Sequence, residues 1–237
     1  MTKLTMTQIN QLNSYSVYLK TAERKLFTLQ DLLKNTTTLD ALVAVQTVSQ
    51  SPNKTVAASY LLRRVGMFIS MQFYNLTLHN EIWKGLPEHL CFGAKEEFGN
   101  VAVSIFVQEE DWVEISEIDR RSTIQFILKE QCHTIIEQVR SVSPIAARTL
   151  WENIFGFLLW HYHVFIEDSN TQEIAKIDLA MLKEDSLWKG ISDHSLFGSY
   201  LKDREPSALL NATVRTTCCL SKDVPGLMQC GFCPLKK

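Results

Sequence analysis

The sequence predicts an α+β fold that is mainly helical, with a small antiparallel sheet and a cysteine-rich segment at the C-terminus. Most long segments place apolar residues at helical spacings of three and four, and one central segment alternates them as a strand does. Four of the six cysteines fall in the last twenty positions. The chain has 237 residues, 46% apolar and 21% charged, enough to bury a sizeable core. We expect a helical body over residues 1–206, with its sheet near 86–116, and a C-terminal segment over 207–237.

The N-terminal third is predicted to be helical. Leucines recur at spacings near three and four within residues 1–34, with charged residues on the other face. The polar break at 35–38 offers an N-cap for a second helix over 39–48. The apolar run 55–79 predicts a third helix, which we expect to be buried.

The centre of the chain, within residues 98–116, changes its period. β-Branched residues alternate with other side chains from 101 to 107, which predicts a strand. The acidic run 109–111 is expected to form the turn of an antiparallel hairpin, although it lacks the usual glycine, and 112–115 the return strand. Residues 86–92 are expected to add a third strand.

The remaining body is predicted to be helical again. A stripe of isoleucine and leucine side chains predicts a long helix over 116–139. Arg120 and Arg121 lie in its first turn, where positive charge opposes the helix dipole. We therefore expect an acidic partner from the hairpin turn, or an anionic ligand. Ser143-Pro144 predicts the start of another helix, and 207–213 are expected to form a last one before the cysteines.

The C-terminal cysteines follow the pattern Cys-Cys-x10-Cys-x2-Cys and predict a metal or redox site. The pattern is formed by Cys218, Cys219, Cys230 and Cys233. Pro225-Gly226 predicts a turn that folds the ten-residue connection back, so that the two cysteine pairs meet. The small Gly231 would let the backbone come close to a bound centre. Four cysteinates suit a [2Fe–2S] cluster or a structural zinc ion, and a pair of disulfides is the third alternative.

Disulfides fit the sequence least well. No signal peptide is recognisable before the first polar residues, so a reducing cytoplasmic location is expected, where clustered cysteines more often bind metal. Cys91 and Cys132 lie far from the cluster among apolar residues. Zinc sites usually use two Cys-x2–4-Cys loops, and the adjacent pair Cys218-Cys219 departs from that pattern.

The cysteine pattern resembles that of the ferric-siderophore reductases of the FhuF type. Arg215-Thr216-Thr217 is similar to that family's approach to the first cysteine, and Leu150-Trp151-Glu152-Asn153 to its Leu-Trp-Gly-Asn segment, with Glu152 in place of glycine. The resemblance implies that the four cysteines hold a [2Fe–2S] cluster. It further implies a one-electron reduction of a ferric siderophore that releases Fe(II). The electron would come from a separate donor, such as a ferredoxin, a flavodoxin or a nicotinamide-dependent reductase.

Cationic and aromatic residues are candidates for holding the ferric complex. Many ferric siderophores are anionic, and a hydroxamate or citrate–hydroxamate ligand is favoured here. Arginine supplies fixed charge and planar donors for such a ligand. The candidates are Arg63, Arg64, Arg120, Arg121, Trp160 and His161. The alternative for each is a structural role, as a surface cation or a core side chain.

Composition excludes some classes and leaves others open. A formal net charge of −2 gives no electrostatic case for nucleic acid. No G-x-G-x-x-G motif for direct nicotinamide binding occurs. The apolar run 154–166 is too short and too polar to span a bilayer, whereas peripheral membrane association stays open. A zinc-stapled siderophore-binding protein and a redox sensor without reductase turnover are the alternative functions.

Overall fold

The computed structural model describes residues 4–97, 99–210 and 212–235, and its fold is α+β, mainly helical, as predicted. Residues 98 and 211, which fall in predicted segments, lie outside the described residues. The α-helices are α1 Met6–Ser14, α2 Leu29–Leu33, α3 Thr38–Ser49, α4 Lys54–His79, α5 Arg120–Phe126, α6 Thr134–Arg140, α7 Ala147–Glu167, α8 Gln172–Lys183 and α9 Leu196–Leu201. Short 3-10 helices span Pro87–His89, Glu109–Asp111, Glu117–Asp119, Asp185–Trp188, Pro206–Leu209 and Ser221–Asp223.

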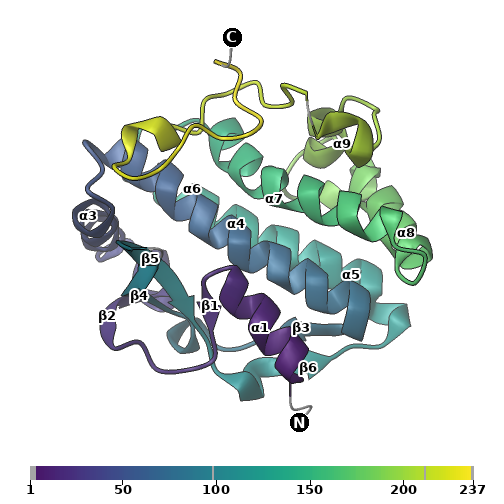
Figure 1. Cartoon of the computed structure of the whole chain (residues 1–237), viewed down its shortest axis with the longest axis horizontal. Helices are drawn as coiled ribbons and strands as arrows, with labels where there is room; N and C mark the ends of the chain where they lie inside the picture. Colours follow the sequence, from purple (N-terminus) through teal and green to yellow (C-terminus); the bar gives the residue numbers. More distant parts are fainter. Residues whose placement is uncertain (1–3, 98, 211, 236–237) are drawn as a thin grey trace.

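The long helices α4 and α7 lie side by side and form the centre of the molecule (Figure 1). Helix α4 begins after Asn53, whose side chain accepts a hydrogen bond from the backbone N–H of Val56. Its contact with α7 is close at Gly66, where an added Cβ would lie 3.0 Å from the carbonyl oxygen of Asn153. A larger side chain at this position would push the two helices apart. The predicted buried helix over 55–79 is confirmed.

Two small sheets flank this helical centre. The first has the order β1-β5-β4-β2, from β1 Val17–Tyr18, β5 Asn100–Phe106, β4 Cys91–Glu97 and β2 Arg24–Thr28. Its β1–β5 pair is parallel and its other pairs are antiparallel, so this sheet is mixed rather than purely antiparallel. The second sheet pairs β3 Glu81–Trp83 with β6 Trp112–Glu114 in antiparallel fashion.

The predicted hairpin is wrong in its partner. Strand β5 pairs with the preceding β4, because Gly99 adopts a φ of +78° and supplies the turn glycine that the acidic run 109–111 lacks. That run forms a 3-10 turn instead, and β6, which follows it, pairs with a different strand, β3. The expected third strand over 86–92 is displaced to 91–97.

The helix predicted within residues 1–34 is also wrong over part of its length. Only α1 and the short α2 are helical there, and β2 lies between them. Strand β2 pairs with β4, and the ring of Phe27 stacks on that of Phe92 at a centroid distance of 4.7 Å. A partner more than sixty residues away thus overrides the local helical spacing.

The helix predicted over 116–139 is confirmed, with a π-helical segment Ile127–His133 between α5 and α6. Its successor α7 begins three residues after Pro144, because the N–H of Ile145 bonds to the carbonyl of Ser143 in a tight turn. The predicted helix over 207–213 is a 3-10 turn, Pro206–Leu209. The second helix, predicted over 39–48, is confirmed as α3.

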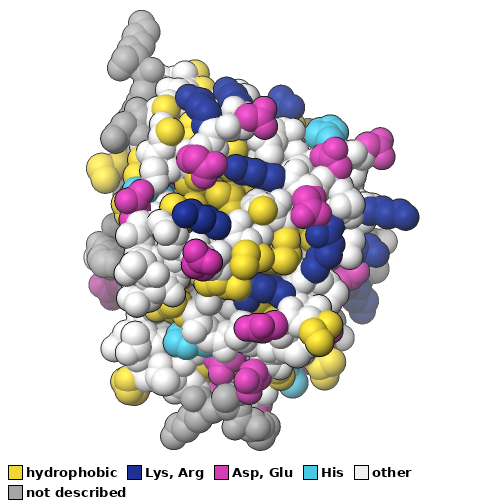
Figure 2. Space-filling model, turned by 90° about the vertical axis from the view of Figure 1, so that its right-hand side faces the viewer, with side chains coloured by type: hydrophobic (Ala, Val, Ile, Leu, Met, Phe, Trp, Pro, Cys, Tyr) yellow, Lys and Arg dark blue, Asp and Glu magenta, His cyan; other side chains and the backbone are white. Residues whose placement is uncertain are grey.

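The C-terminal segment shares the core of the body. Leu209, Val214 and Val224 are buried in the same apolar cluster as the side chains between α4 and α7. On the face in Figure 2, side chains of both charge signs are interspersed around a strip of apolar ones, in keeping with the small net charge. Among the described residues, no helix has both the length and the apolar character needed to cross a bilayer.

Candidate functional site

The cysteine segment, defined here as residues 214–235, crosses the N-terminal halves of α4 and α7 (Figure 1, yellow). Ser59 of α4 donates a hydrogen bond of 2.7 Å to the carbonyl oxygen of Cys219. Asn153 of α7 donates in turn to the carbonyl and hydroxyl oxygens of Ser59, both at 2.9 Å. The backbone of the adjacent cysteine pair is therefore tied to both central helices through buried polar groups.

Glu152 anchors the two residues that precede the cysteines. Its carboxylate oxygens accept the N–H groups of Thr216 and Thr217 at 3.1 and 3.0 Å, and both hydroxyls at 2.6 Å. Arg215 lies beside this carboxylate and donates to the backbone carbonyls of Glu152 and Thr149. Two sequence segments of the stated resemblance, 150–153 and 215–217, are thus in direct contact. The carboxylate at the position where the family has glycine has a clear structural use here.

The ten-residue connection turns back at the predicted position. The N–H of Leu227 bonds to the carbonyl of Val224 at 3.1 Å across Pro225-Gly226, and Gly226 has a φ of +78°. This is the geometry of a turn with glycine in its third position, so the prediction is confirmed. A second turn joins the N–H of Cys233 to the carbonyl of Cys230 at 3.2 Å.

The close approach of the Gly231 backbone to a bound centre, which the sequence predicts, stays a prediction. An added Cβ there would meet no atom within 4 Å, and its φ lies outside the left-handed region. The turn between Cys230 and Cys233 therefore does not depend on a glycine for its own conformation.

The sulfurs of Cys218 and Cys233 accept hydrogen bonds from donors close by in the chain. The N–H of Leu220 points to Sγ of Cys218 at 3.4 Å, and that of Leu235 to Sγ of Cys233 at 3.4 Å. Gln229 donates to the sulfur of Cys233 at 3.0 Å. In iron–sulfur proteins, hydrogen bonds to the ligand sulfurs tune the reduction potential of the cluster.

Cys219 is buried, and its sulfur has a thiol, a hydroxyl and a guanidinium group as neighbours. The thiol of Cys230 donates a hydrogen bond to its sulfur and lowers the pKa of Cys219, and Ser221 and the charge of Arg63 act in the same direction against the effect of burial. Arg63 lies 3.6 Å from this sulfur and also donates to the hydroxyl of Ser221. Burial raises the pKa of the remote thiols Cys91 and Cys132, which are less reactive by the same reasoning.

The donor set fits a four-cysteinate centre, but the thiols are not gathered around one point. Among the described residues, no three histidine, cysteine, aspartate or glutamate side chains lie together as metal ligands. Cys219 and Cys230 are in contact, which brings together one member of each sequence pair. Cys218, Cys219, Cys230 and Cys233 would be the residues that hold a [2Fe–2S] cluster.

A cavity of about 420 Å³ opens beside the cysteine segment and is called here the Cys230 cavity. Two of the predicted substrate residues, Arg63 of α4 and Trp160 of α7, line it together with Cys230. Trp160 is 49% exposed, so it can be reached from solvent. Arg215 also lines the cavity and was not among the predicted substrate residues. Its position three residues before the first cysteine is the sequence feature that could have identified it.

The other predicted substrate residues lie elsewhere and have structural partners. Arg64 pairs with Glu97 at 3.2 Å, and Arg121 with the exposed Glu184 at 2.7 Å. Arg120 is buried against Asp178 and also donates to the carbonyl of Leu76, about 25 Å along α4 from the cysteine contact at Ser59. The expected acidic partners of Arg120 and Arg121 exist, but they come from α8 and the residue that follows it rather than from the hairpin turn.

His161 is a core side chain. Its ring lies 4.1 Å from that of Phe165 and 5.9 Å from that of Tyr74. Burial lowers the pKa of His161 to about 3, against a smaller effect of a hydrogen bond with the backbone of Phe73. The imidazole is thus held neutral, away from the Cys230 cavity.

Comparison with known proteins assigns no relative: no family model matches the chain, and no curated protein matches its sequence. The geometry of the cysteine segment and of the Cys230 cavity therefore carries the functional conclusion.

Proposed function

We propose that this protein is a cytoplasmic ferric-siderophore reductase of the FhuF type, with a [2Fe–2S] cluster held by Cys218, Cys219, Cys230 and Cys233. The observation that carries the proposal is the cysteine segment itself: four cysteines in an ordered loop, three with sulfurs that accept hydrogen bonds, beside a cationic cavity. A bound [2Fe–2S] cluster supplies one electron, at a potential that sulfur hydrogen bonds and exposure set.

The Cys230 cavity suits an anionic ferric complex. Arg63 supplies a fixed positive charge, and a guanidinium group can donate two parallel hydrogen bonds to a carboxylate. Arg215 also lines the cavity, but its charge is paired with that of Glu152. Phe157, Trp160 and Phe232 supply apolar and aromatic walls for the organic part of the ligand. Cys230 lines the same cavity, so a complex held there would lie next to the cysteine segment.

The substrate's own chemistry explains how iron would be released. Hydroxamate and citrate oxygens are hard donors that hold Fe(III) tightly and Fe(II) far less tightly, because Fe(II) has the lower charge density. One electron is therefore enough, and no acid, base or nucleophile from the protein is needed. A separate electron donor is expected, because the sequence has no motif for binding a nicotinamide cofactor.

The test is the anaerobic reoxidation of dithionite-reduced protein by two ferric complexes, an anionic citrate–hydroxamate and a neutral trihydroxamate. We expect both to reoxidise the protein. Arg63→Gln should slow the second-order reaction with the anionic complex about tenfold and leave that with the neutral complex within about twofold, because only the charged ligand loses an attraction.

The neutral complex controls for any effect of Arg63 on the potential through Cys219. Arg121→Gln, which removes an exposed arginine far from the cavity, is the matched control and should leave both rates unchanged. Equal slowing with both complexes would place the anionic ligand elsewhere. Failure of both complexes to reoxidise the native protein would end the reductase proposal.

A further inference from the structure

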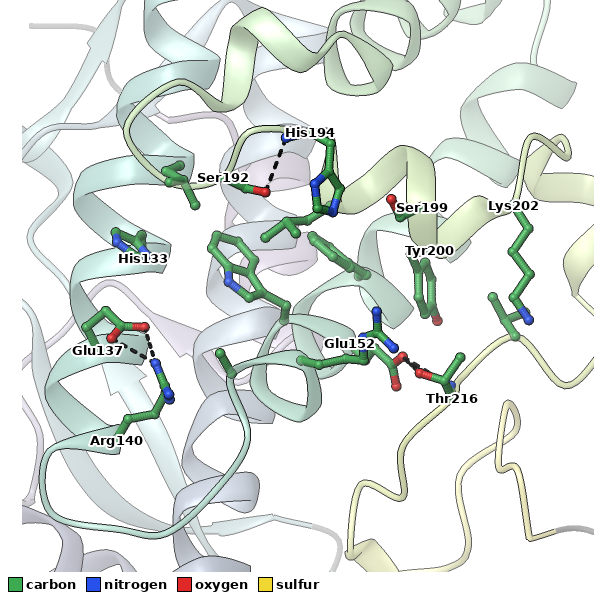
Figure 3. A pocket seen from close by; sticks show the side chains of 17 residues that line it. His133, Glu137, Arg140, Glu152, Ser192, His194, Ser199, Tyr200, Lys202 and Thr216 are labelled. Carbon is green, nitrogen blue, oxygen red and sulfur yellow. Dashed lines mark hydrogen bonds and ion pairs between the residues drawn. The ribbon is translucent and has the colours of Figure 1, made fainter.

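A second cavity, of about 520 Å³, lies between α7 and α9 and is called here the α7–α9 cavity (Figure 3). It is separate from the Cys230 cavity, and the two have no lining residue in common. Its walls come from α6 and the π-helical segment, the start of α7, residues 191–202 and the chain at 214–216. Its volume is within the range of small-molecule sites.

The rim of this cavity is cationic. Arg148 at the start of α7 and Lys202 at the end of α9 line it, are exposed, and form no ion pair with any described residue. Of the two carboxylates in the lining, Glu137 is neutralised by Arg140 at 2.8 Å. The other, Glu152, is fully engaged with Thr216, Thr217 and Arg215. The rim therefore keeps two uncompensated positive charges.

The floor of the cavity is aromatic and carries one unused polar group. The rings of Trp151 and Phe155 stack at a centroid distance of 5.4 Å, and that of Tyr200 lies 5.5 Å from Phe155. Tyr200 is only 5% exposed, and its hydroxyl has no hydrogen-bond partner within the described residues. In Figure 3 this hydroxyl points toward the Glu152–Thr216 wall. A buried hydroxyl without a partner costs free energy unless a ligand or water satisfies it.

We propose that the α7–α9 cavity is a second binding site, for a small organic anion with an apolar or aromatic body and two negative charges on carboxylate or phosphate groups. Arg148 and Lys202 would meet the charged groups, the aromatic floor the body, and Tyr200 one oxygen atom. This site does not rest on the proposed function. It adjoins the cysteine segment through Thr216, so an occupied cavity would also hold that segment in place.

The test is isothermal titration calorimetry on the full chain as purified, with three small probes. Isophthalate carries two carboxylates on an aromatic ring, phenyl phosphate carries a phosphate, and isophthalamide is the uncharged isostere of the first. We expect at least one of the two anions to bind and isophthalamide to bind at least about tenfold more weakly than isophthalate. Binding of isophthalate alone or of phenyl phosphate alone would identify the charged group that the site prefers.

Variants assign the binding to this cavity. The double variant Arg148→Gln/Lys202→Gln should weaken binding of the anion at least about tenfold, and Tyr200→Phe should weaken it without a change of charge. Arg24→Gln/Lys176→Gln makes the same change in net charge at exposed residues that line neither cavity and should leave the affinity unchanged. Arg63→Gln should also leave it unchanged.

Three results would overturn the proposal. The first is the absence of binding by both anions at concentrations up to roughly 10 mM. The second is equal affinity for isophthalate and isophthalamide. The third is an unchanged affinity in the Arg148→Gln/Lys202→Gln variant, or a loss caused by Arg63→Gln, which would move the anion to the Cys230 cavity.

Discussion

Glu152 is a buried carboxylate that holds the approach to the cysteines through four hydrogen bonds. It also lies 3.8 Å from Arg215, and both side chains are 5% exposed. Removing one charge of such a buried pair leaves the other charge buried without a partner. The resulting loss of stability usually exceeds what the intact pair contributed. Glu152 therefore contributes both to the stability of the fold and to the fixed conformation of the cysteine segment.

We predict that Glu152→Gln lowers the free energy of unfolding by about 3 kcal/mol, measured by urea denaturation. Hydrogen exchange at the amides of Thr216 and Thr217 should accelerate, because an amide side chain cannot accept all four bonds. Glu167→Gln, at an exposed carboxylate that accepts one bond from Ser207, is the control and should change stability by less than about 0.5 kcal/mol. Unchanged amide exchange in Glu152→Gln would contradict the anchoring role.

His161 makes the stability depend on pH. Its pKa in the folded state is about 3, below the ordinary value of 6.5, because burial disfavours the imidazolium form. Between these values only the unfolded chain binds the proton, so stability is present above pH 6.5 and is lost as the pH falls. We predict that His161→Phe removes about 1.4 kcal/mol per pH unit from the slope between pH 6 and 4, measured by urea denaturation.

The neighbouring Tyr162→Phe variant controls for a change of packing at the same depth. Burial raises the pKa of the Tyr162 hydroxyl well above its ordinary value of 10, so this side chain stays neutral across the acidic range. The variant should keep the slope of the native protein. A slope that is the same in His161→Phe and in the native protein would mean that another group carries the acid sensitivity.

At the scale of elements, the ion pair of Arg120 and Asp178 joins α5 to α8 and to the end of α4. Arg120 donates to both carboxylate oxygens of Asp178 at 2.6 Å and to the carbonyl of Leu76 at 3.0 Å. The Arg120 and Asp178 side chains are 4% and 0% exposed. This arginine thus serves to fasten three helices.

We predict that Arg120→Gln costs about 3 to 5 kcal/mol of stability, because it leaves a buried carboxylate without its partner. Arg121→Gln breaks a pair whose side chains are 43% and 48% exposed and should cost less than about 1 kcal/mol. Thermal or urea unfolding of the two variants measures the difference. Equal losses of stability in the two variants would show that the buried pair does not hold these helices together.

An element was predictable when the residues that determine it lie close together in the sequence. Helices α3 and α4 and the turn at Pro225-Gly226 depend on nearby residues, so their positions were predictable. Strand β2 and the pairing of β6 with β3 depend on partners far along the chain, and periodicity does not contain that information. The start of α7 was misplaced because a tight turn at Ser143 uses the residues that would have begun the helix.

The clustering of the four cysteines was predictable from the sequence, and their surroundings were predictable only in part. The spacing of the cysteines is a local pattern, whereas Glu152 reaches Thr216 across 64 positions. Of the six predicted substrate residues, Arg63 and Trp160 meet at the Cys230 cavity. The others are used in ion pairs or in the core, because adjacent residues on a helix point to different sides.

At the scale of the whole molecule, the cysteine segment and the body form one structure. The segment is bonded to α4 and α7 at Ser59 and Glu152, and Val224 is buried in the common core. This arrangement places the cysteines against the two long central helices, with the Cys230 cavity beside them. The proposed cluster, if bound there, would be held by a segment with buried contacts to both helices.

The most direct measurement is the absorption spectrum of anaerobically purified protein before and after dithionite, with iron, sulfide and zinc counted. We predict bands between about 400 and 600 nm that bleach on reduction, with about two irons and two sulfides per chain. Cys219→Ser should lose them, and Cys91→Ser, at a thiol remote from the segment, should keep them. A colourless protein with one zinc ion per chain, or a full cluster in Cys219→Ser, would contradict the account.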